Sequence, residues 1–362
     1  MLIYLSLIIT GSDENLARIL VTGGGGFIGS HLAEFFSKRE DDVVVYDNLS
    51  RSNVLGRSSG SDLLNWNFLK DIGSIELVRG DIRDQEFLSE NVGRPDVILH
   101  AAAQVAVTTS LKDPREDFTT NALGTFNLLE LARRSDSKFI YFSTNKVYGE
   151  NVNAFPVTED GKRYRFLGDR LEYGVPETFP VDLTGHSPYG SSKFSADIYT
   201  QDYAHTYGLK TGIFRMSCIY GDRQMGVEDQ GWVAWFIIAS LTGKKITIYG
   251  DGKQTRDVLH ISDLIAAVDK FLGSKISHDV FNIGGGPSNT LSLLELLDMI
   301  KSTTNNEPEI YFSDWRAADQ RLYVSDIRKV KNDLDWKPRV SPQEGVRKVT
   351  EWVSSNRSLF TS

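Results

Sequence analysis

The stretch TGGGGFIG, Thr22–Gly29, is the most informative part of this sequence for predicting the fold. It follows the short β-branched run ARILV and opens the segment FIGSHLAEFFSKRE (27–40), whose apolar residues recur at helical spacing. In this strand–turn–helix context, Gly23 permits the tight turn, Gly26 lets the backbone approach a pyrophosphate, and Gly29 allows the helix to pack closely on the sheet. The stretch therefore predicts a dinucleotide-binding site, with the phosphates at the N-terminus of the helix.

The second strand, DVVVYD (42–47), ends at Asp47, 18 residues after Gly29. A carboxylate there accepts hydrogen bonds from the ribose hydroxyls and repels a 2′-phosphate, so the predicted cofactor is NAD rather than NADP. Arg51 is an observation in favour of NADP, because an arginine just after the acidic residue could pair with the 2′-phosphate; the predicted cofactor is still NAD. Further predicted cofactor contacts flank these motifs or follow later strands: Phe27, Ile28, Asn48, Ser50, Asp81, Ile82, Ala101, Ala102, Ala103, Gln104 and Asn121.

Strand and helix patterns alternate along the rest of the chain, which predicts a doubly wound parallel sheet of the Rossmann type with a smaller α/β substrate lobe. We expect an NAD-binding domain at 17–217, with segments near 254–284 returning to it. The lobe is expected at 218–253 and 285–362, and residues 1–16 are expected to form an extension. The long, aromatic and proline-punctuated stretch 150–184 is typical of a lid or binding loop.

The segment SPYGSSK places Tyr189 and Lys193 four residues apart on a predicted helix, so that both side chains share one face. A free phenol has a pKa near 10, and a neighbouring ammonium and a cationic nicotinamide ring both favour the phenolate that a general base needs. Ser143 and Thr144, at the end of the preceding strand, present hydroxyls that can bind the same substrate oxygen. On its own the Tyr–Lys pair is more often an exposed helix face; after a complete dinucleotide motif we interpret it as catalytic.

Composition narrows the class of protein. The formal net charge of −8 over 362 residues, without a long basic run, argues against a nucleic-acid partner. A single cysteine, Cys218, excludes an intrachain disulfide and fits a reducing cytoplasm. The apolar opening MLIYLSLIIT (1–10) is far shorter than the roughly 20 residues that cross a bilayer. Six scattered histidines without H-x-x-x-H spacing predict no metal site.

Several further stretches of the sequence are similar to those of a known enzyme family. They are DNLSR (47–51), QVAVTTS (104–110), STNKVYG (143–149), HSPYG (186–190), YGDRQMGVEDQGWVAWF (220–236), GKQTRDVLH (252–260) and DQRLYVSDI (319–327). Together with the glycine motif they resemble the extended short-chain dehydrogenase/reductase family from Ala17 onward and, within it, the 2-epimerases of CDP-linked hexoses. The resemblance implies a tightly held NAD, transient oxidation of the sugar at carbon 2, as in conversion of CDP-paratose to CDP-tyvelose, and a homo-oligomer, dimer or tetramer.

The resemblance also implies roles for particular residues. Thr144 matches the catalytic hydroxyl, Tyr189 the base and Lys193 its partner. The residues that match substrate contacts are Thr108, Thr144, Asn145, Gln224, Gln230, Arg256, Arg316 and Arg321. The three arginines fall where relatives hold the nucleotide diphosphate, a task that suits the bidentate guanidinium fork, although a surface salt bridge is the usual alternative for any one of them.

Four alternatives share some of these features. A sugar 4,6-dehydratase needs an acid and a base after the catalytic threonine, where this chain has Asn145 and Lys146. A UDP-hexose 4-epimerase would use the same chemistry at another carbon. A plain dehydrogenase would release NADH. A non-catalytic NAD-sensing or scaffold protein would not need Thr144, Tyr189 and Lys193.

Overall fold

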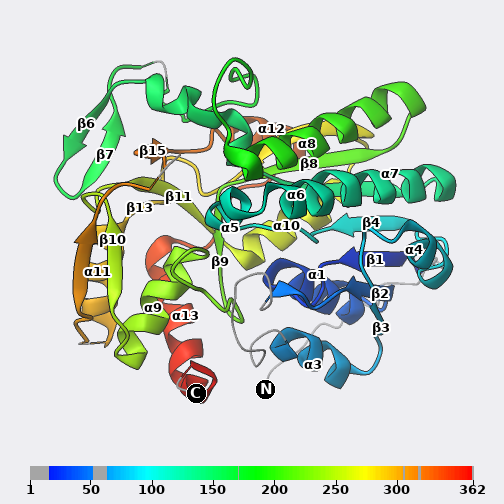
Figure 1. Cartoon of the computed structure of the whole chain (residues 1–362), viewed down its shortest axis with the longest axis horizontal. Coiled ribbons are helices and arrows are strands. Elements are labelled where there is room, and N and C mark those ends of the chain that lie inside the picture. The colour runs from blue at the N-terminus through cyan, green and yellow to red at the C-terminus, as the bar shows by residue number, and fades with distance from the viewer. Residues whose placement is uncertain (1–15, 52–62, 170, 305, 317–318, 361–362) are drawn as a thin grey trace, which may run out of the picture.

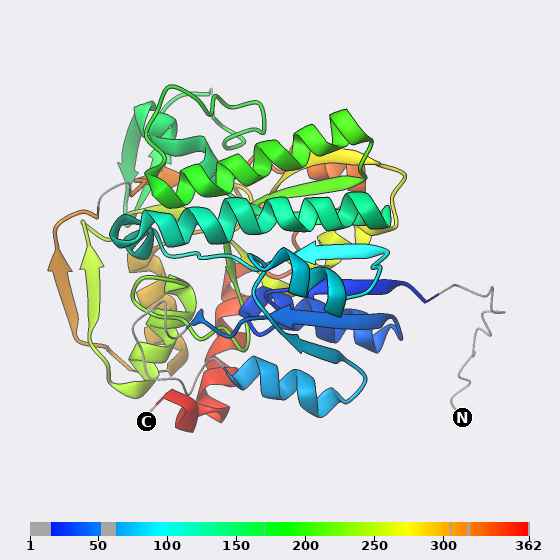
Figure 2. The same cartoon turned by 45° about the vertical axis from the view of Figure 1, so that its right-hand side comes forward.

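The computed structural model describes residues 16–51, 63–169, 171–304, 306–316 and 319–360. The predicted extension, apart from Leu16, lies outside the described residues. A large parallel sheet with helices on both faces occupies one side of the molecule, and a smaller α/β lobe lies beside it (Figures 1 and 2).

The large sheet has the strand order β12-β8-β5-β4-β1-β2-β3, and each neighbouring pair is parallel. Its order reverses direction at β1, which places a topological switch point between β1 and β4. The predicted doubly wound fold is confirmed. The strands are β1 (Arg18–Thr22), β2 (Asp42–Asp47), β3 (Glu76–Arg79), β4 (Val97–His100), β5 (Lys138–Thr144), β8 (Thr211–Met216) and β12 (His278–Ile283).

Near-continuous apolar runs build the central strands because both faces of a parallel sheet are covered. Alternate residues of one strand enter different cores: Val21 packs with Phe36 and Phe271 on one face, and Leu20 packs with Leu128 on the other. The first face is covered by α1 (Phe27–Lys38), α3 (Leu63–Ile72), α10 (Ile261–Leu272) and α12 (Arg328–Leu334). The second is covered by α4 (Gln85–Asn91), α7 (Gly124–Ser135) and α8 (Ser187–Tyr207).

Short helical segments connect the strands of the large sheet to the helices that cover it. They are α5 (Val107–Lys112), α6 (Pro114–Phe118), the π-helical turn η1 (Thr119–Leu123), which runs directly into α7, and the 3₁₀ segment η2 (Asn145–Ala154) after β5. Single π turns inside helices often accompany functional sites. Here the π turn carries the buried Asn121, which is bonded to Gln104 and Ser192.

The smaller lobe packs around its own core, in which Phe236, Ile248 and Leu296 are buried. Its strands are β9 (Cys218–Tyr220), β10 (Ile246–Tyr249), β11 (Thr255–His260), β13 (Thr290–Ser292), β14 (Ile310–Ser313) and β15 (Leu322–Tyr323), and its helices are α9 (Trp232–Thr242), α11 (Leu293–Thr304), α13 (Pro342–Ser355) and η3 (Arg357–Phe360). The stretch 150–184 includes a hairpin of β6 (Val157–Asp160) and β7 (Arg163–Phe166), which contacts the lobe's small sheet.

The chain crosses between the two parts more than once. In the segment near 254–284, α10 covers the large sheet and β12 joins it, whereas β11 pairs with β9, β13 and β15 in the lobe. Helix α12, expected in the lobe, packs with the core of the large sheet through Val330 and Leu334. Late segments therefore tie the lobe to the sheet.

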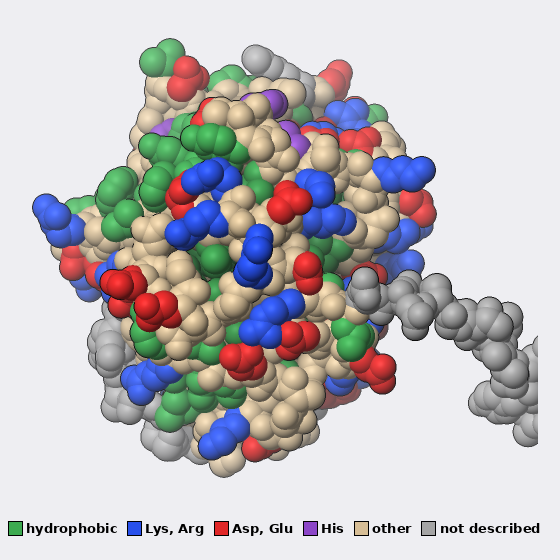
Figure 3. Space-filling view, turned by 90° about the vertical axis from the view of Figure 1, so that its right-hand side faces the viewer, with side chains coloured by type: hydrophobic (Ala, Val, Ile, Leu, Met, Phe, Trp, Pro, Cys, Tyr) green, Lys and Arg blue, Asp and Glu red, His purple; other side chains and the backbone are tan. Residues whose placement is uncertain are grey.

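The described surface shows no concentration of one charge on the face drawn in Figure 3, where acidic and basic side chains are interspersed. Among the described helices, none combines the length and the apolar character that crossing a membrane requires.

Candidate functional site

The glycine loop between β1 and α1 forms the floor of the site. Gly23 has a φ of 71°, and a Cβ atom there would lie 2.6 Å from the backbone nitrogen of Ala102. A Cβ on Gly29 would lie 2.3 Å from the carbonyl oxygen of Gly23. A side chain at Gly23 would push the loop away from the segment after β4, and a side chain at Gly29 would push α1 away from the loop. Glycine is therefore required at both positions for close packing. The loop leaves the first N–H groups of α1 facing a cavity, which suits a phosphate.

Asp47 lies at the end of β2 beside this loop. Its carboxylate accepts hydrogen bonds from the backbone nitrogens of Gly25, at 2.9 Å, and Leu49, at 2.7 Å. The carboxylate is thus fixed at the cavity wall, where it can meet ribose hydroxyls.

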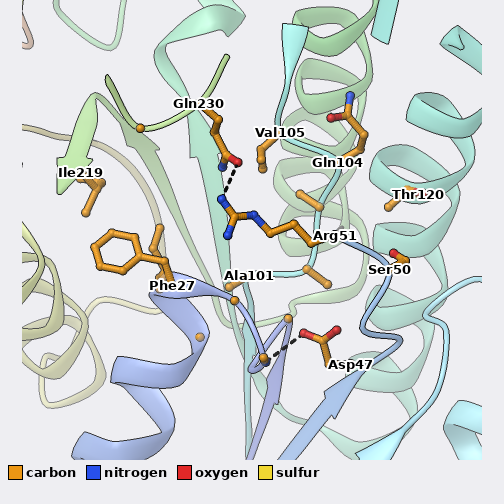
Figure 4. A pocket seen from close by; sticks show the side chains of 18 of the residues that line it. Phe27, Asp47, Ser50, Arg51, Ala101, Gln104, Val105, Thr120, Ile219 and Gln230 are labelled. Atoms are coloured by element: carbon orange, nitrogen blue, oxygen red, sulfur yellow. Dashed lines mark hydrogen bonds between the residues drawn. The ribbon is translucent and has the colours of Figure 1, made fainter. Parts of the chain in front are cut away.

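Arg51 reaches across the cavity rather than toward a phosphate site next to Asp47. Its guanidinium donates to the carbonyl oxygen of Met225, at 2.9 Å. It also donates to Oε1 of Gln230, at 3.1 Å (Figure 4). These bonds connect the loop after β2 with the loop before α9.

A cavity of about 370 Å³ extends from the glycine loop to the end of β5. Its wall includes most of the residues predicted to bind cofactor or substrate: Gly23, Gly26, Phe27, Ile28, Gly29, Asp47, Asn48, Ser50, Arg51, Ile82, Ala101, Ala102, Ala103, Gln104, Thr144, Tyr189, Gln224 and Gln230. Gln224 is buried, its amide donates to the carbonyl of Ile219, and its Oε1 has no partner among the described residues. An orphaned buried acceptor in a cavity wall indicates a ligand that donates to it.

Other wall residues were missed by sequence reasoning. The cavity is also lined from the end of β8, the start of β9 and the start of α9, by Met216, Ser217, Cys218, Ile219, Trp232 and Val233. The position of Met216 and Ser217 after a strand of the parallel sheet was the available signal, since ligands bind at the carboxyl ends of such strands.

Asp81 and Asn121 lie behind the wall. Asp81 accepts hydrogen bonds from Asn48, at 2.9 Å, and from Arg83; burial raises its pKa, but the bonds from Arg83 outweigh burial and bring the pKa down to about 2. Asn121 accepts from the backbone nitrogen of Gln104, at 2.8 Å, and donates to Oγ of Ser192, at 3.0 Å. Both residues position wall residues from behind.

Thr144 and Tyr189 meet at the inner end of the cavity. Thr144 ends β5, and Tyr189 lies in the first turn of α8, where Ser110 accepts a hydrogen bond from its backbone nitrogen at 3.1 Å. A hydrogen bond joins the two side chains. Ser143 also lines the cavity, but its hydroxyl donates to Oδ2 of the buried Asp197, at 2.7 Å, whereas the Thr144 hydroxyl makes a longer bond, at 3.3 Å, to Oδ1 of the adjacent Asn145.

The pKa of Tyr189 differs from the sequence-based expectation. Burial raises it to about 12, and the hydrogen bond from Thr144 only partly opposes this change. The pKa of Lys193 falls from its ordinary value to about 7, again because of burial, with Asp197 and Asp117 opposing. Lys193 Nζ donates to the carbonyl oxygen of Phe142, at 2.8 Å, and lies 4.2 Å from the ring centroid of Tyr141. The protein groups alone therefore favour the phenol.

The remaining predicted substrate residues lie outside the cavity wall. Arg256 pairs with Asp319 at 2.8 Å, and Arg316 pairs with Asp229 at 2.9 Å while its guanidinium lies 3.9 Å from the ring centroid of Tyr249. Arg321 lies over the ring of Trp315. Thr108 lies on α5 and the buried Asn145 follows Thr144.

This fold and site define the extended short-chain dehydrogenase/reductase class: a glycine loop with an acidic residue after β2, and a Thr–Tyr pair with a buried lysine one turn further along the helix. Residues 20–349 match the family model described as GDP-mannose 4,6 dehydratase, and the chain belongs to this family.

Three known proteins illustrate the similarity. CDP-paratose 2-epimerase of Salmonella typhi is 43% identical over 349 residues, covering 93% of this chain and 99% of that protein. The structure of UDP-glucose 4-epimerase of Thermotoga maritima with UDP-glucose has a TM-score of 0.78 and 31% identity, covering 94% of this chain and 99% of that one. UDP-glucose 4-epimerase of Thermus thermophilus, in complex with NAD, has a TM-score of 0.75 and 30% identity, covering 93% and 99%.

Proposed function

We propose that this chain is an NAD-dependent epimerase that inverts carbon 2 of a CDP-linked hexose, as in the conversion of CDP-paratose to CDP-tyvelose. The observation that carries the proposal is the contact between Thr144 and Tyr189, together with the two residues that follow Thr144. These residues are Asn145 and Lys146, whereas elimination of water needs carboxylates at these positions. The similarity to CDP-paratose 2-epimerase over nearly the whole of both chains supports the choice of sugar.

The cavity fits a dinucleotide. Gly23 and Gly29 keep its floor free of side chains, Asp47 presents a fixed carboxylate, and Gln224 offers an orphaned acceptor. The residues that would hold NAD are the wall residues of the glycine loop, the end of β2 and the end of β4. When bound, NAD supplies the two-electron acceptor and donor for the reacting carbon, and its cationic ring favours the phenolate form of Tyr189.

The protein's own groups manage the substrate proton. Carbon 2 of a hexose has no neighbouring carbonyl, so its hydrogen is not acidic and direct proton abstraction would be slow. Tyr189 accepts the proton of the 2-hydroxyl, and Thr144 donates a hydrogen bond to the same oxygen. Lys193 lies one helical turn after Tyr189 and donates to the carbonyl of Phe142; in its protonated form it would favour the phenolate. The oxidised sugar must then rotate while the nucleotide stays bound, so that the hydride returns to its opposite face. The complete reaction involves no net redox change.

Product stereochemistry tests the proposal directly. Purified protein is incubated with CDP-paratose, CDP-glucose and UDP-glucose, and the configurations at carbons 2 and 4 are determined by NMR. We expect inversion at carbon 2 of a CDP-hexose without accumulation of absorbance at 340 nm. Inversion only at carbon 4 of UDP-glucose would instead establish the alternative function, that of a UDP-hexose 4-epimerase. The structural similarity to UDP-glucose 4-epimerases supports testing this alternative.

Cofactor preference gives a second expected outcome. Asp47 accepts from two backbone nitrogens and Arg51 is bonded to Met225 and Gln230, so a 2′-phosphate would meet a carboxylate instead of a guanidinium. Cofactor-free protein is expected to bind NAD at least about 10²-fold more tightly than NADP, and Asp47→Ser to narrow this ratio about tenfold by removing the repulsion. Fluorescence titration measures both affinities. Asp42→Ser, at the opposite end of β2, is the control, and an unchanged ratio in Asp47→Ser would contradict the assignment.

We also propose a cytoplasmic homo-oligomer, a dimer or tetramer. The free thiol of Cys218 supports a reducing compartment. Apolar side chains exposed along α7 and α8, among them Phe126, Ile198, Tyr199 and Tyr207, support an interface between copies of the chain.

A further inference from the structure

A buried carboxylate connects the cavity wall to the helix that carries Tyr189. Asp117, on α6, is 1% exposed. Its Oδ1 accepts a hydrogen bond from Nε2 of Gln104, at 2.7 Å, and a longer one from Nδ2 of Asn121, at 3.3 Å. Its Oδ2 accepts from the Ser192 hydroxyl of α8, at 2.5 Å. One carboxylate is therefore bonded both to a residue that lines the cavity, Gln104, and to the catalytic helix.

The connection through α8 ends at the carbonyl group of Tyr189. Ser192 follows Tyr189 by three residues on this helix and is buried. Its hydroxyl oxygen lies 3.0 Å from the carbonyl oxygen of Tyr189, in addition to its shorter bond to Asp117. Asn121 donates to the same hydroxyl oxygen, at 3.0 Å. Bonds on these sides fix the Ser192 side chain against the backbone of Tyr189.

The connection through the cavity wall ends at the backbone nitrogen of Tyr189. The Gln104 side chain bonds back to Ala106, with Oε1 accepting from the Ala106 nitrogen at 2.6 Å and Nε2 donating to the Ala106 carbonyl at 3.0 Å. That carbonyl also accepts from the backbone nitrogen of Ser110, at 3.1 Å. The Ser110 hydroxyl in turn accepts from the Tyr189 nitrogen, at 3.1 Å. Chains of hydrogen bonds thus lead from Asp117 to both sides of the Tyr189 backbone.

The donors around Asp117 are neutral amide and hydroxyl groups. Keeping a carboxylate away from water costs free energy unless hydrogen bonds satisfy it, and bonds to a charged acceptor are stronger than bonds between neutral groups. Burial accordingly raises the pKa of Asp117, and the bonds from Ser192 and Gln104 oppose this change. The bonds that stabilise the buried charge are therefore strong constraints on the two segments that supply them.

We propose that Asp117 is a positioning residue that holds Tyr189 at its working distance from the cofactor wall. This inference rests on the proposed function, from which it needs Tyr189 as the base but not the choice of carbon. The wall segment that ends at Gln104 and the first turn of α8 are far apart in the sequence, and Asp117 is bonded to both. A shift of about 1 Å between a base and the reacting atoms can lower a rate about 10²-fold. Asp117 acts on Tyr189 through Gln104 and Ser192.

Four variants separate this role from a general effect on the fold. Asp117→Ala leaves the donors of Gln104 and Ser192 without their acceptor, whereas Asp117→Asn keeps an amide oxygen in the same place. Ser192→Ala removes only the connection through α8. Asp113→Ala is the matched control, because the exposed Asp113 caps the same helix by accepting from the backbone nitrogen of Glu116, at 2.9 Å.

Rates of epimerisation are compared per site that holds NAD, with the bound NAD measured after its release from denatured protein. Asp117→Ala is expected to lower kcat about 10²-fold, and Ser192→Ala about tenfold. Asp117→Asn and Asp113→Ala should each keep kcat within about threefold of wild type, since the bonds to Gln104 and Ser192 can still form. In the Asp117→Ala background, Ser192→Ala should lower kcat by less than a further factor of about three, because both changes break the same connection. Isothermal titration with CDP should give affinities within about threefold of wild type, which shows that the sites are folded.

Three results would overturn the role of Asp117. They are a loss of kcat in Asp113→Ala or in Asp117→Asn as large as that in Asp117→Ala, and a CDP affinity that falls in parallel with kcat. If Asp117→Ala does not fold, Ser192→Ala decides alone, and a kcat within about threefold of wild type overturns the proposal.

Failure of the proposed function has a different signature. If wild type inverts carbon 4 instead of carbon 2, the proposed reaction is wrong, and the same comparison of variants on that reaction still decides the role of Asp117. If wild type inverts neither carbon, the proposed function fails and the role of Asp117 fails with it.

Discussion

Replacing Tyr189 with phenylalanine is expected to lower kcat for epimerisation by about 10²–10⁴-fold, the usual contribution of a positioned general acid–base group. The ring fills the same buried volume at the start of α8, so the loss is confined to the hydroxyl that bonds Thr144. The bond from the backbone nitrogen of Tyr189 to Ser110 does not involve the side chain and persists. Binding of cofactor and of CDP should therefore stay within a few-fold of wild type.

The pH dependence of kcat makes this expectation more specific. Burial raises the pKa of Tyr189 to about 12 in the protein without cofactor; bound NAD would lower this pKa, and in either state the phenolate fraction grows as the pH rises. Wild-type kcat should increase with pH on the alkaline side, and the residual rate of Tyr189→Phe should lack that increase. Tyr173→Phe, at an exposed tyrosine, is the control. A Tyr189→Phe variant that kept more than about a tenth of wild-type kcat would remove Tyr189 from the mechanism.

Removing Asp197 is expected to have the largest effect on stability. Asp197 on α8 accepts two hydrogen bonds from Arg215 on β8, each at 3.0 Å, and their side chains are 0% and 6% exposed. It also accepts from Ser143, which precedes the reacting Thr144. Asp197→Ala leaves a buried guanidinium without its carboxylate, which should cost about 3–5 kcal/mol of unfolding free energy.

Denaturant unfolding of the NAD-loaded protein measures this difference. The control is Asp298→Ala, which breaks the exposed pair of Asp298 with Lys162 and should cost at most about 1 kcal/mol. Equal shifts of the two unfolding midpoints would show that the Asp197–Arg215 pair does not anchor α8 to the sheet.

Much of the fold could be predicted because its determinants lie close together along the chain. The β-branched run before Gly23, the apolar spacing of α1 and the end of β2 at Asp47 each lie within one short segment. The spacing of Tyr189 and Lys193 places both on α8 for the same reason, since four residues are about one helical turn. Contacts that join distant segments, such as the cavity lining from Met216 to Val233, have no comparable local signal.

Three details of the site depended on such distant contacts. Ser143 and Thr144 are equivalent in sequence, but only packing against Asp197 of α8 engages the Ser143 hydroxyl. The pKa of Tyr189 rises because the folded chain buries the phenol, which a four-residue spacing does not reveal. Arg51 turns toward Gln230, 179 positions further along the chain.

Sequence patterns were enough to predict the doubly wound sheet, the glycine loop with Asp47, and the helix that carries Tyr189 and Lys193, because hydrophobic periodicity and turn-forming residues act between near neighbours. The folded structure was needed to show which of the two hydroxyls is bonded to Asp197 and which arginines are paired with carboxylates. Burial and charge pairing depend on segments that lie far apart in the sequence and meet only in the folded chain.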